Sequence, residues 1–249
     1  IRDGRRLFDV IKRLTPRKPV LIWRGGQTSA GSRATASHTA SLAQDGAVWE
    51  ALFRQTGAIP IDGLEEMVDT MKALQFLKPS RGTRLGLITM TGGPSVVLTD
   101  TFAKQGLEIP PLTEASYDRF RAFFSNIGGS YKNPVDMGMN WAGENFPEIM
   151  RIMLDDPNID AVVNDLPLTF LYRRMALRSD FKENLFATFG EMRERYDKPL
   201  LAVVGFSPFE KEEVDFRQEL LDAGVPAFHN FERAARAFRH ASYYHRHVQ

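Results

Sequence analysis

The chain has 249 residues, of which 43% are hydrophobic and 25% charged, and its formal net charge is +1. A chain of this length can bury one large core or two smaller ones, and its charge balance gives no reason to expect a nucleic-acid partner. The absence of cysteine excludes disulfides, thiolate metal sites and a thiol nucleophile. No apolar run reaches the length of about 18 residues that a membrane span needs, and no signal peptide opens the chain, so we expect a cytoplasmic protein.

The N-terminal third of the chain predicts a small α/β unit. Its apolar residues recur at helix or strand spacing in helix 3–14, buried strand 19–23, helix 46–56 and strand 58–60. Another helix is expected after a capping Asp62, with a core face of Leu64, Met67, Val68, Met71 and Leu74. A parallel sheet needs helices on both of its faces, and two strands with three helices are too few to build such a covered sheet. Because the first residue is Ile1 and not Met, we expect a fragment whose missing strands lie upstream or on another chain.

A second, larger unit is expected after a linker at 79–82. Strands are predicted at 85–90, 161–166, 200–204 and 226–228, and helices at 96–105, 114–124, 145–155, 180–196, 209–222 and 231–245. A loop containing Pro167 is expected between the second of these strands and the next helix. Strands that alternate with helices are typical of a parallel, doubly wound sheet. We therefore predict an α/β protein of two flavodoxin-like units, residues 1–79 and 80–249, with the first incomplete at its N-terminus.

Residues 25–43 form the stretch with the clearest chemical character, and we expect them to be a long loop after strand 19–23. The stretch combines glycines and hydroxyl side chains with one histidine, His38. Imidazole is a good nucleophile near neutral pH, and free backbone N–H groups and hydroxyls suit a phosphate dianion. We therefore name His38 as the candidate catalytic residue, and as candidate phosphate ligands Gly25, Gly26, Arg33, Ser37 and Thr39. The alternative is a loop histidine that only caps or fills space.

Three further features allow more than one interpretation. The turn at 91–95 lies between a strand and a helix, so Gly92 and Gly93 either bind phosphate or simply permit tight packing. Asp136 and Asp165 end strands, where they either orient a ligand or a metal or cap a loop, and we predict no metal site. The basic residues near the C-terminus are interpreted as a solvated helix face and not a binding patch; they are Arg233, Arg236, Arg239, His240, His245, Arg246 and His247.

Several segments, in order along the chain, resemble the nucleoside-diphosphate-forming acyl-CoA synthetases. These are the ADP-forming acetate–CoA ligase relatives of succinyl-CoA synthetase. The most specific part is Lys18–Ile22, Gly26–Thr28, Gly31–Ala34 and Ala36–Thr39. The likeness continues through Phe53–Gln55, Gly57–Ile59, Leu64–Glu66, Thr91–Pro94, Asn133–Asp136, Asp156–Pro157 and Glu232–Ala237.

The resemblance implies a defined activity. In the family, an acyl phosphate passes its phosphoryl group to a histidine on a mobile loop, and from there to a nucleoside diphosphate. His38 matches that phosphohistidine, which would make 1–79 the histidine-bearing subdomain and 80–249 the CoA-ligase subdomain. The family uses CoA, ATP or ADP and Mg²⁺, held largely by a CoA-binding subdomain and an ATP-grasp module. Neither is recognisable in this chain, so we expect both in cis or on another subunit of an oligomer, and no activity from the chain alone.

The chain also departs from the family pattern. Ala40 stands where the family usually has glycine, and residues 167–170 lack the glycines that succinyl-CoA synthetase uses for phosphate. The acidic residue that orients the phosphohistidine in the family would lie just before Ile1. These departures keep open a non-catalytic paralogue that binds a ligand or a partner protein. A third interpretation is a phosphoacceptor of the response-regulator type. It is weak, because this sequence lacks the cluster of acidic residues that such a protein needs at its first strand.

Overall fold

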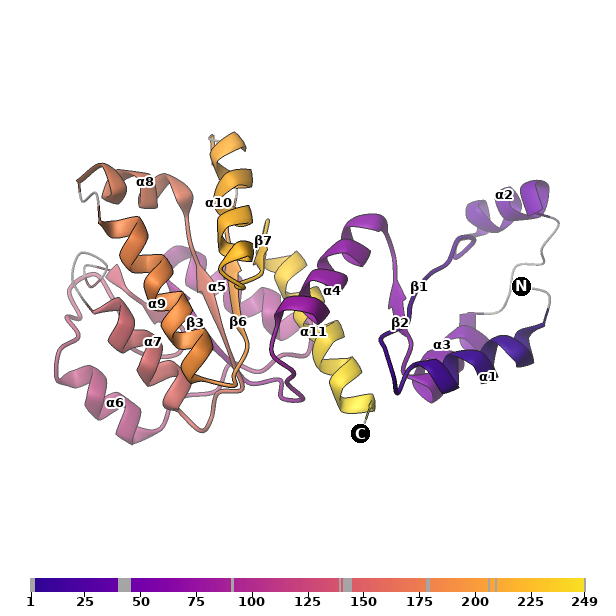
Figure 1. Cartoon of the computed structure of the whole chain (residues 1–249), viewed down its shortest axis with the longest axis horizontal. Coiled ribbons are helices and arrows are strands. Elements are labelled where there is room, and N and C mark those ends of the chain that lie inside the picture. The colour runs from indigo at the N-terminus through magenta and orange to yellow at the C-terminus, as the bar shows by residue number, and fades with distance from the viewer. Residues whose placement is uncertain are drawn as a thin grey trace.

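The computed structural model describes residues 3–39, 46–90, 92–138, 140, 145–177, 180–205, 207–208 and 210–248, without the side chains of 36–39, 173–174 and 176–177. Within this part of the chain there are two parallel sheets (Figure 1). The small sheet pairs β1 (Leu21–Trp23) with β2 (Ile59–Ile61). The large sheet contains β3 (Leu85–Thr89), β4 (Val135–Asp136), β5 (Ala161–Asp165), β6 (Leu200–Val203) and β7 (Ala227–Phe228).

The strand order of the large sheet is β4-β3-β5-β6-β7, and every neighbouring pair is parallel. Numbered within the C-terminal unit, this is the order 2-1-3-4-5 of flavodoxin-like folds. The direction of winding changes at β3, which pairs with β4 on one side and with β5 on the other. The structure therefore confirms the predicted α/β class with doubly wound parallel strands.

Helices cover both faces of the large sheet because its strands carry apolar residues on both faces, and every residue of β3, β5 and β6 is buried. Val162 and Leu166 join one core cluster with α6, α7, α9 and α10, whereas Leu87 and Val163 join another with α5 and α11. The helices are α1 (Gly4–Leu14), α2 (Ser29–Thr39), α3 (Gly46–Thr56), α4 (Leu64–Phe76), α5 (Gly92–Lys104), α6 (Glu114–Arg121), α7 (Phe146–Asp155), α8 (Leu168–Leu177), α9 (Phe181–Arg195), α10 (Glu210–Asp222) and α11 (Phe231–His247).

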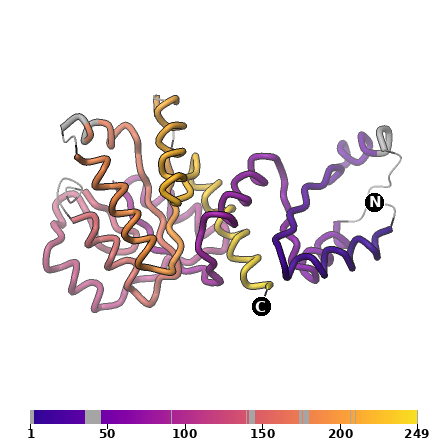
Figure 2. The backbone as a smooth tube through the Cα atoms, viewed as in Figure 1, coloured from indigo at the N-terminus to yellow at the C-terminus, as the bar shows by residue number. Residues whose placement is uncertain are grey.

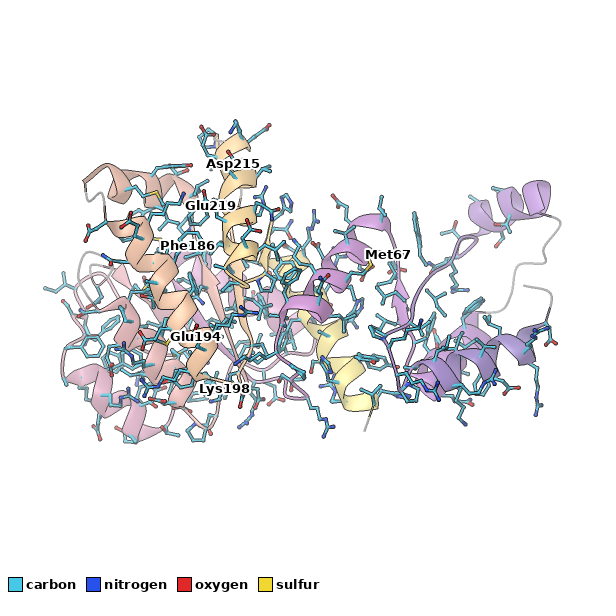
Figure 3. The ribbon with its side chains drawn as sticks, viewed as in Figure 1. Met67, Phe186, Glu194, Lys198, Asp215 and Glu219 are labelled. Atoms are coloured by element: carbon cyan, nitrogen blue, oxygen red, sulfur yellow. The ribbon has the colours of Figure 1, made fainter. Side chains whose placement is uncertain are left out.

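Helices α9 and α10 lie next to each other on the first of these faces. The rings of Phe186 and Phe216 meet edge to face with centroids 5.6 Å apart, and Lys182 pairs with Glu219 at 2.5 Å. Figure 3 labels Phe186 on α9 and Glu219 on α10. No helix within the described residues is long and apolar enough to cross a membrane.

Helix α4 packs against α11, between the small sheet and the large sheet (Figure 2). Their interface is polar: Asp69 pairs with Arg233 at 2.5 Å, and Thr70 is hydrogen-bonded to His240 at 3.0 Å. The prediction of a solvated basic face on the C-terminal helix is therefore wrong for Arg233 and His240. The cause is α4, which supplies partners that bury His240 and leave only 16% of the Arg233 side chain exposed.

Other expectations about the N-terminal unit are also corrected. Strand 19–23 was expected to be buried, yet β1 is short and Trp23 is 53% exposed, because a two-stranded sheet has little cover. Asp62 does not cap α4, since the helix begins after Gly63 and the Glu66 carboxylate accepts the Asp62 N–H at 2.8 Å.

The predicted core face of α4 is wrong in part. Its residues Leu64, Val68 and Met71 are exposed, while Asp69 and Thr70 are buried against α11. Helix α8 occupies residues expected to be a loop, and Pro167 stands just before its first turn, where the ring fits. The boundary between residues 79 and 80 stays a prediction, because α4 contacts both β2 and α11.

Asn133 ties the loop before β4 to the centre of the sheet. Its Oδ1 accepts the Leu87 N–H at 3.0 Å, and its Nδ2 donates to the carbonyl oxygens of Leu85 and Pro110, both at 2.8 Å. We predict that Asn133→Ala lowers the free energy of unfolding by about 3 kcal/mol, because three backbone groups lose their partner. Urea unfolding measures the change, with the exposed Gln55→Ala as the control. Equal stability of the two variants would contradict this assignment.

Candidate functional site

The turn after β1 is built by glycines that allow close packing. Gly26 has φ 79°, and a Cβ on Gly31 would lie 3.2 Å from the Cα of Gly26. Thr28 Oγ1 accepts the Gly31 N–H at 3.1 Å and so caps α2, and the Ser32 hydroxyl donates to the Gly26 carbonyl oxygen at 2.9 Å. Glycine is therefore needed here for the geometry of the turn.

The expectation of a long loop over 25–43 is wrong for residues 29–39, which form α2. Alanine at positions 30, 34 and 36 favours a helix, and Thr28 supplies the cap. The Thr35 hydroxyl donates to the Gly31 carbonyl oxygen at 2.9 Å, one turn back in the helix. Two of the hydroxyls expected to face a ligand, those of Ser32 and Thr35, thus bond to the backbone.

The backbone of His38 lies in the last turn of α2. The side chains of Ser37, His38 and Thr39, and all of Ala40, lie outside the described residues, so their predicted roles stay predictions. Gly25, Gly26 and the exposed Arg33 are described, with the two glycines just before the start of the helix. From Ser29 to His38 the helix rises about 14 Å. The structure therefore does not bring the glycines and His38 to one phosphate.

A second group of candidate residues lies at the carboxyl edge of the large sheet. Gly92 and Gly93 begin α5, and a Cβ on Gly92 would lie 3.0 Å from Asp136 Oδ2. Asp136 Oδ1 also accepts the Gly138 N–H at 3.1 Å, as the capping interpretation expects. Burial raises the pKa of Asp136, although the hydrogen bond from Gly138 opposes this. Phosphate binding by Gly92 and Gly93 stays a prediction, and Asp136 is a competing acceptor there.

The end of β5 places two more polar side chains at this edge. Both amide atoms of Asn164 are buried without a hydrogen-bond partner. Asp165 is also buried, and desolvation raises the pKa of its carboxyl group to about 7. Such a group can hold or release a proton near neutral pH, which is a property of ligand and catalytic sites. The carboxyl edge is where ligands bind in open parallel sheets.

A buried ion pair near this edge was not predicted from the sequence. Glu213 on α10 accepts the Ser207 N–H and pairs with Arg217 at 3.2 Å. Arg217 in turn donates to the Val204 carbonyl oxygen at 3.3 Å, just after β6. In the sequence, glutamate and arginine four residues apart are typical of a solvated helix face. Among the described side chains, no three His, Cys, Asp or Glu residues gather as metal ligands.

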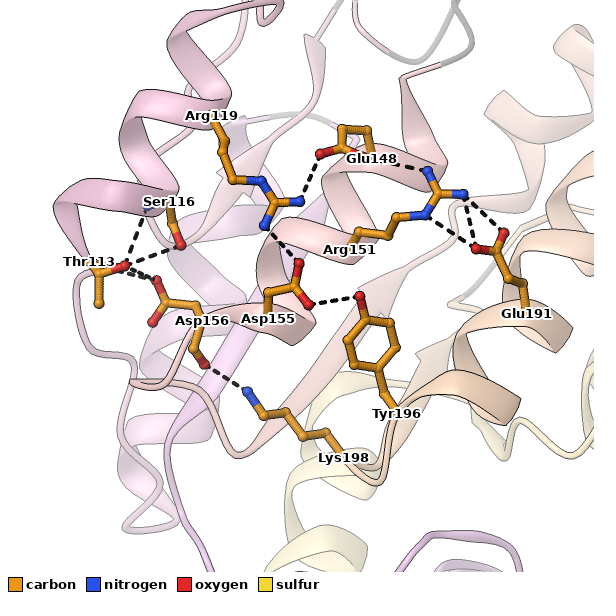
Figure 4. A network of polar contacts seen from close by, with 10 residues as sticks. All are labelled: Thr113, Ser116, Arg119, Glu148, Arg151, Asp155, Asp156, Glu191, Tyr196 and Lys198. Carbon is orange, nitrogen blue, oxygen red and sulfur yellow. Dashed lines mark hydrogen bonds and ion pairs between the residues drawn. The ribbon is translucent and has the colours of Figure 1, made fainter.

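The polar network in Figure 4 holds helices together and is not a candidate site. Arg119 on α6 bridges Glu148 at 2.8 Å and Asp155 at 2.7 Å, both on α7, and Arg151 of α7 pairs with Glu191 of α9 at 3.0 Å. These contacts join neighbouring helices on the first face of the sheet.

Asp156 forms the other half of this network. Its Oδ2 accepts the Thr113 N–H at 2.8 Å and the Thr113 hydroxyl at 2.9 Å. Burial alone would raise the pKa of Asp156, but hydrogen bonds from Ser116, Thr113 and Asn158 lower it overall. The Asp156 carboxylate therefore stabilises the fold and is not a candidate ligand or catalytic group.

The two groups of candidate residues are separated in space. In Figure 1, α2 lies at one end of the long axis and the large sheet lies toward the other, with α4 and α11 between them. The turn before α2 and the carboxyl edge of the large sheet are thus two separate candidate sites, one on each unit.

Comparison with known proteins assigns the chain to a family. Residues 85–247 match the family described as Ligase-CoA domain, and residues 1–74 match the succinyl-CoA ligase like flavodoxin domain. The chain belongs to the NDP-forming acyl-CoA synthetases, the family that the sequence resembles.

Similar curated proteins carry names from the same family. The alpha subunit of ADP-forming acetate–CoA ligase II from Pyrococcus furiosus is 37% identical over 164 residues, which cover 66% of this chain and 35% of that protein. The alpha subunit of ligase I from the same organism is 29% identical and covers 95% of this chain and 49% of that protein. The chain thus spans a third to a half of the length of these relatives.

A solved structure agrees with the sequence comparison. The acetyl-coenzyme A synthetase 1 of Ca. Korarchaeum cryptofilum, described as dinucleotide forming and solved with phosphate and ADP, has a TM-score of 0.77 and 27% identity. The match covers 98% of this chain and 50% of that one.

The raised pKa of Asp165 predicts a pH-dependent stability. Between its usual pKa of 3.8 and about 7, the unfolded chain has released the proton while the folded chain retains it, so stability falls as pH rises. Asp165→Asn removes this loss. Relative to that of the parent, the free energy of unfolding of the variant should rise by on the order of 4 kcal/mol between about pH 4 and about pH 8.

Urea unfolding at both pH values measures this difference, and the exposed Asp100→Asn serves as the control. A difference between Asp165→Asn and the parent that is the same at both pH values would show that the Asp165 carboxyl group titrates normally.

Proposed function

We propose that this chain is the histidine-bearing part of an NDP-forming acyl-CoA synthetase. The proposed enzyme interconverts acyl-CoA, phosphate and ADP with a carboxylic acid, CoA and ATP, as an acid–thiol ligase. The observation that carries the proposal is family membership along nearly the whole chain, with His38 in its most specific segment. The printed names of the relatives, ADP-forming ligases of acetate or 4-hydroxybutyrate, support the reaction class.

His38 would act as a phosphoryl carrier. A ring nitrogen of the neutral imidazole attacks the phosphorus of an acyl phosphate, the bond from phosphorus to the acyl oxygen breaks, and the carboxylate leaves. In the second transfer, a terminal oxygen of ADP attacks the phosphorus, which forms ATP and restores the imidazole. The place of His38 at the end of α2, far from the large sheet, suits a group that serves two separated sites (Figure 1).

The carboxyl edge of the large sheet is the proposed second site. Gly92 and Gly93 offer backbone N–H groups at the start of α5, and Asn164 offers an unpaired buried amide. These groups would position a phosphate or an acyl phosphate. CoA, the nucleotide and Mg²⁺ would be held by a CoA-binding region and an ATP-grasp region in cis or on another subunit, so this chain alone would not complete the reaction.

The proposal predicts a labelled histidine. The full-length protein that contains this chain, incubated with γ-labelled ATP and Mg²⁺, should acquire a label that is labile in acid and stable in base. The label should disappear in His38→Ala, because the carrier nitrogen is lost, and remain in His247→Ala, which changes an exposed histidine of α11. Label that persists in His38→Ala would reject the role.

A non-catalytic paralogue is the second candidate function. The observation that favours it is the use of the Ser32 and Thr35 hydroxyls in bonds to the backbone, which withdraws them from a ligand. On that view the full-length protein would show no labelled histidine at all. The labelling experiment therefore separates the two functions.

A further inference from the structure

A cavity of about 450 Å³ lies between the two units, at the opposite edge of the large sheet from the candidate site. It is lined by α3 and β2 on one side and, on the other, by α11, the segment before β3 and the end of α5. Its volume lies within the range of small-molecule sites in proteins. Nothing in the proposed phosphoryl transfer uses this space.

The cavity is rich in unpaired positive charge. Arg54, Arg239 and Arg246 line it, against a single carboxylate, that of Glu50. Among the described residues, none of the three guanidinium groups forms an ion pair. Elsewhere in the chain arginines form ion pairs with carboxylates, as Arg84 does with Asp160 at 2.7 Å. Because the net charge of the whole chain is only +1, this excess is local.

Arg239 is held in place by a relay that begins on α4. Its Nη2 donates to His240 Nε2 at 3.0 Å, so that nitrogen carries no proton and Nδ1 donates to Thr70 Oγ1 at 3.0 Å. Burial, with Arg239 and Arg236 nearby, lowers the pKa of His240 to about 4, which keeps the ring neutral. A neutral acceptor behind Arg239 orients its fork without forming an ion pair with it, and the Glu66 carboxylate lies 3.7 Å from the same nitrogen of His240.

The rest of the lining combines apolar and aromatic side chains with the polar Thr83, Gln105 and His240. Phe53 and Leu107 line the cavity together with Tyr243, whose hydroxyl donates to the Phe53 carbonyl oxygen at 3.0 Å and so joins α11 to α3. Guanidinium forks match phosphate oxygens in geometry and charge, and aromatic faces pack against planar rings. The two kinds of wall together fit a ligand with an anionic end and a planar body.

We infer that this cavity between α3 and α11 binds a phosphorylated small molecule of nucleotide size, a nucleoside diphosphate by class. The phosphates contact Arg54, Arg239 and Arg246, and the base lies against Phe53 and Tyr243. Because Arg54 belongs to the N-terminal unit and the other two arginines to α11, the bound ligand links the units. The site is separate from the phosphoryl transfer proposed for His38.

The test is calorimetric titration of the purified 249-residue chain with ADP, inorganic pyrophosphate and adenosine. We expect saturable binding of ADP, weaker binding of pyrophosphate, which lacks the planar body, and no binding of adenosine, which lacks the charge. Arg54→Ala and Arg246→Ala, made on different units, should each weaken ADP binding about tenfold or more. Circular dichroism checks that each variant is folded, and two independent variants protect the test if one is not.

Arg121→Ala is the matched control, because Arg121 is an exposed arginine already paired with Glu114 and Asp118. It should bind ADP as the parent does, and so should His38→Ala. The inference is overturned if the parent chain does not bind ADP, or if ADP affinity is unchanged in both cavity variants. Loss of ADP binding in His38→Ala would show that ADP binds at α2 and would overturn the inference. Absence of a phosphohistidine label from the full-length protein would reject the role of His38 and would not bear on this cavity.

Discussion

A buried polar contact between α4 and α11 joins the N-terminal unit to the large sheet. Asp69 is almost fully buried there and has its charge compensated by Arg233. A buried carboxylate that loses its partner is strongly destabilising, so each of these two helices needs the other. The same two helices carry apolar residues into the core of the large sheet, where Ala73 and Phe238 belong to one cluster. The polar pair thus fixes how the units join.

Helix α11 extends this role beyond α4. Its final turns reach the N-terminal unit, where the Tyr244 hydroxyl donates to the Thr15 carbonyl oxygen at 3.2 Å. A Cβ on Gly57 would lie 1.9 Å from a ring carbon of His247, so only glycine permits this approach. One helix therefore contributes to the large-sheet core, to the joint between units and to the wall of the cationic cavity. Because α11 packs against several elements, some of its basic residues are buried and others are exposed.

The arrangement places anion-competent groups at separate points of one chain. The turn before α2 lies on the N-terminal unit, the carboxyl edge with Asn164 and Asp165 lies on the C-terminal unit, and the cavity lined by Arg54 and Arg239 lies between the units. A reaction that moves a phosphoryl group between distinct partners needs such separated sites. The chain spans only part of the length of its relatives, and its candidate sites belong to that part.

Patterns in the amino-acid sequence were enough to predict the fold class and the family. Apolar runs at 85–90 and 161–166 that alternate with helical spacing are local signals, because strand and helix periodicity need no knowledge of the partner element. The segment around His38 likewise identified the family, and Asp136 and Asp165 stood out as carboxylates at strand ends. Local chemistry was enough for each of these.

Which side chains are buried, paired or brought together follows from the folded arrangement of the elements. Residues 29–39 were predicted to be a loop because of their glycines and hydroxyl side chains. Their alanines and the Thr28 cap favour the helix that the structure shows. The buried side of α4 is polar because α11 offers Arg233 and His240, which lie more than 160 residues further along the chain. Burial and pairing depend on groups that are distant in sequence, and periodicity within one segment carries no information about them.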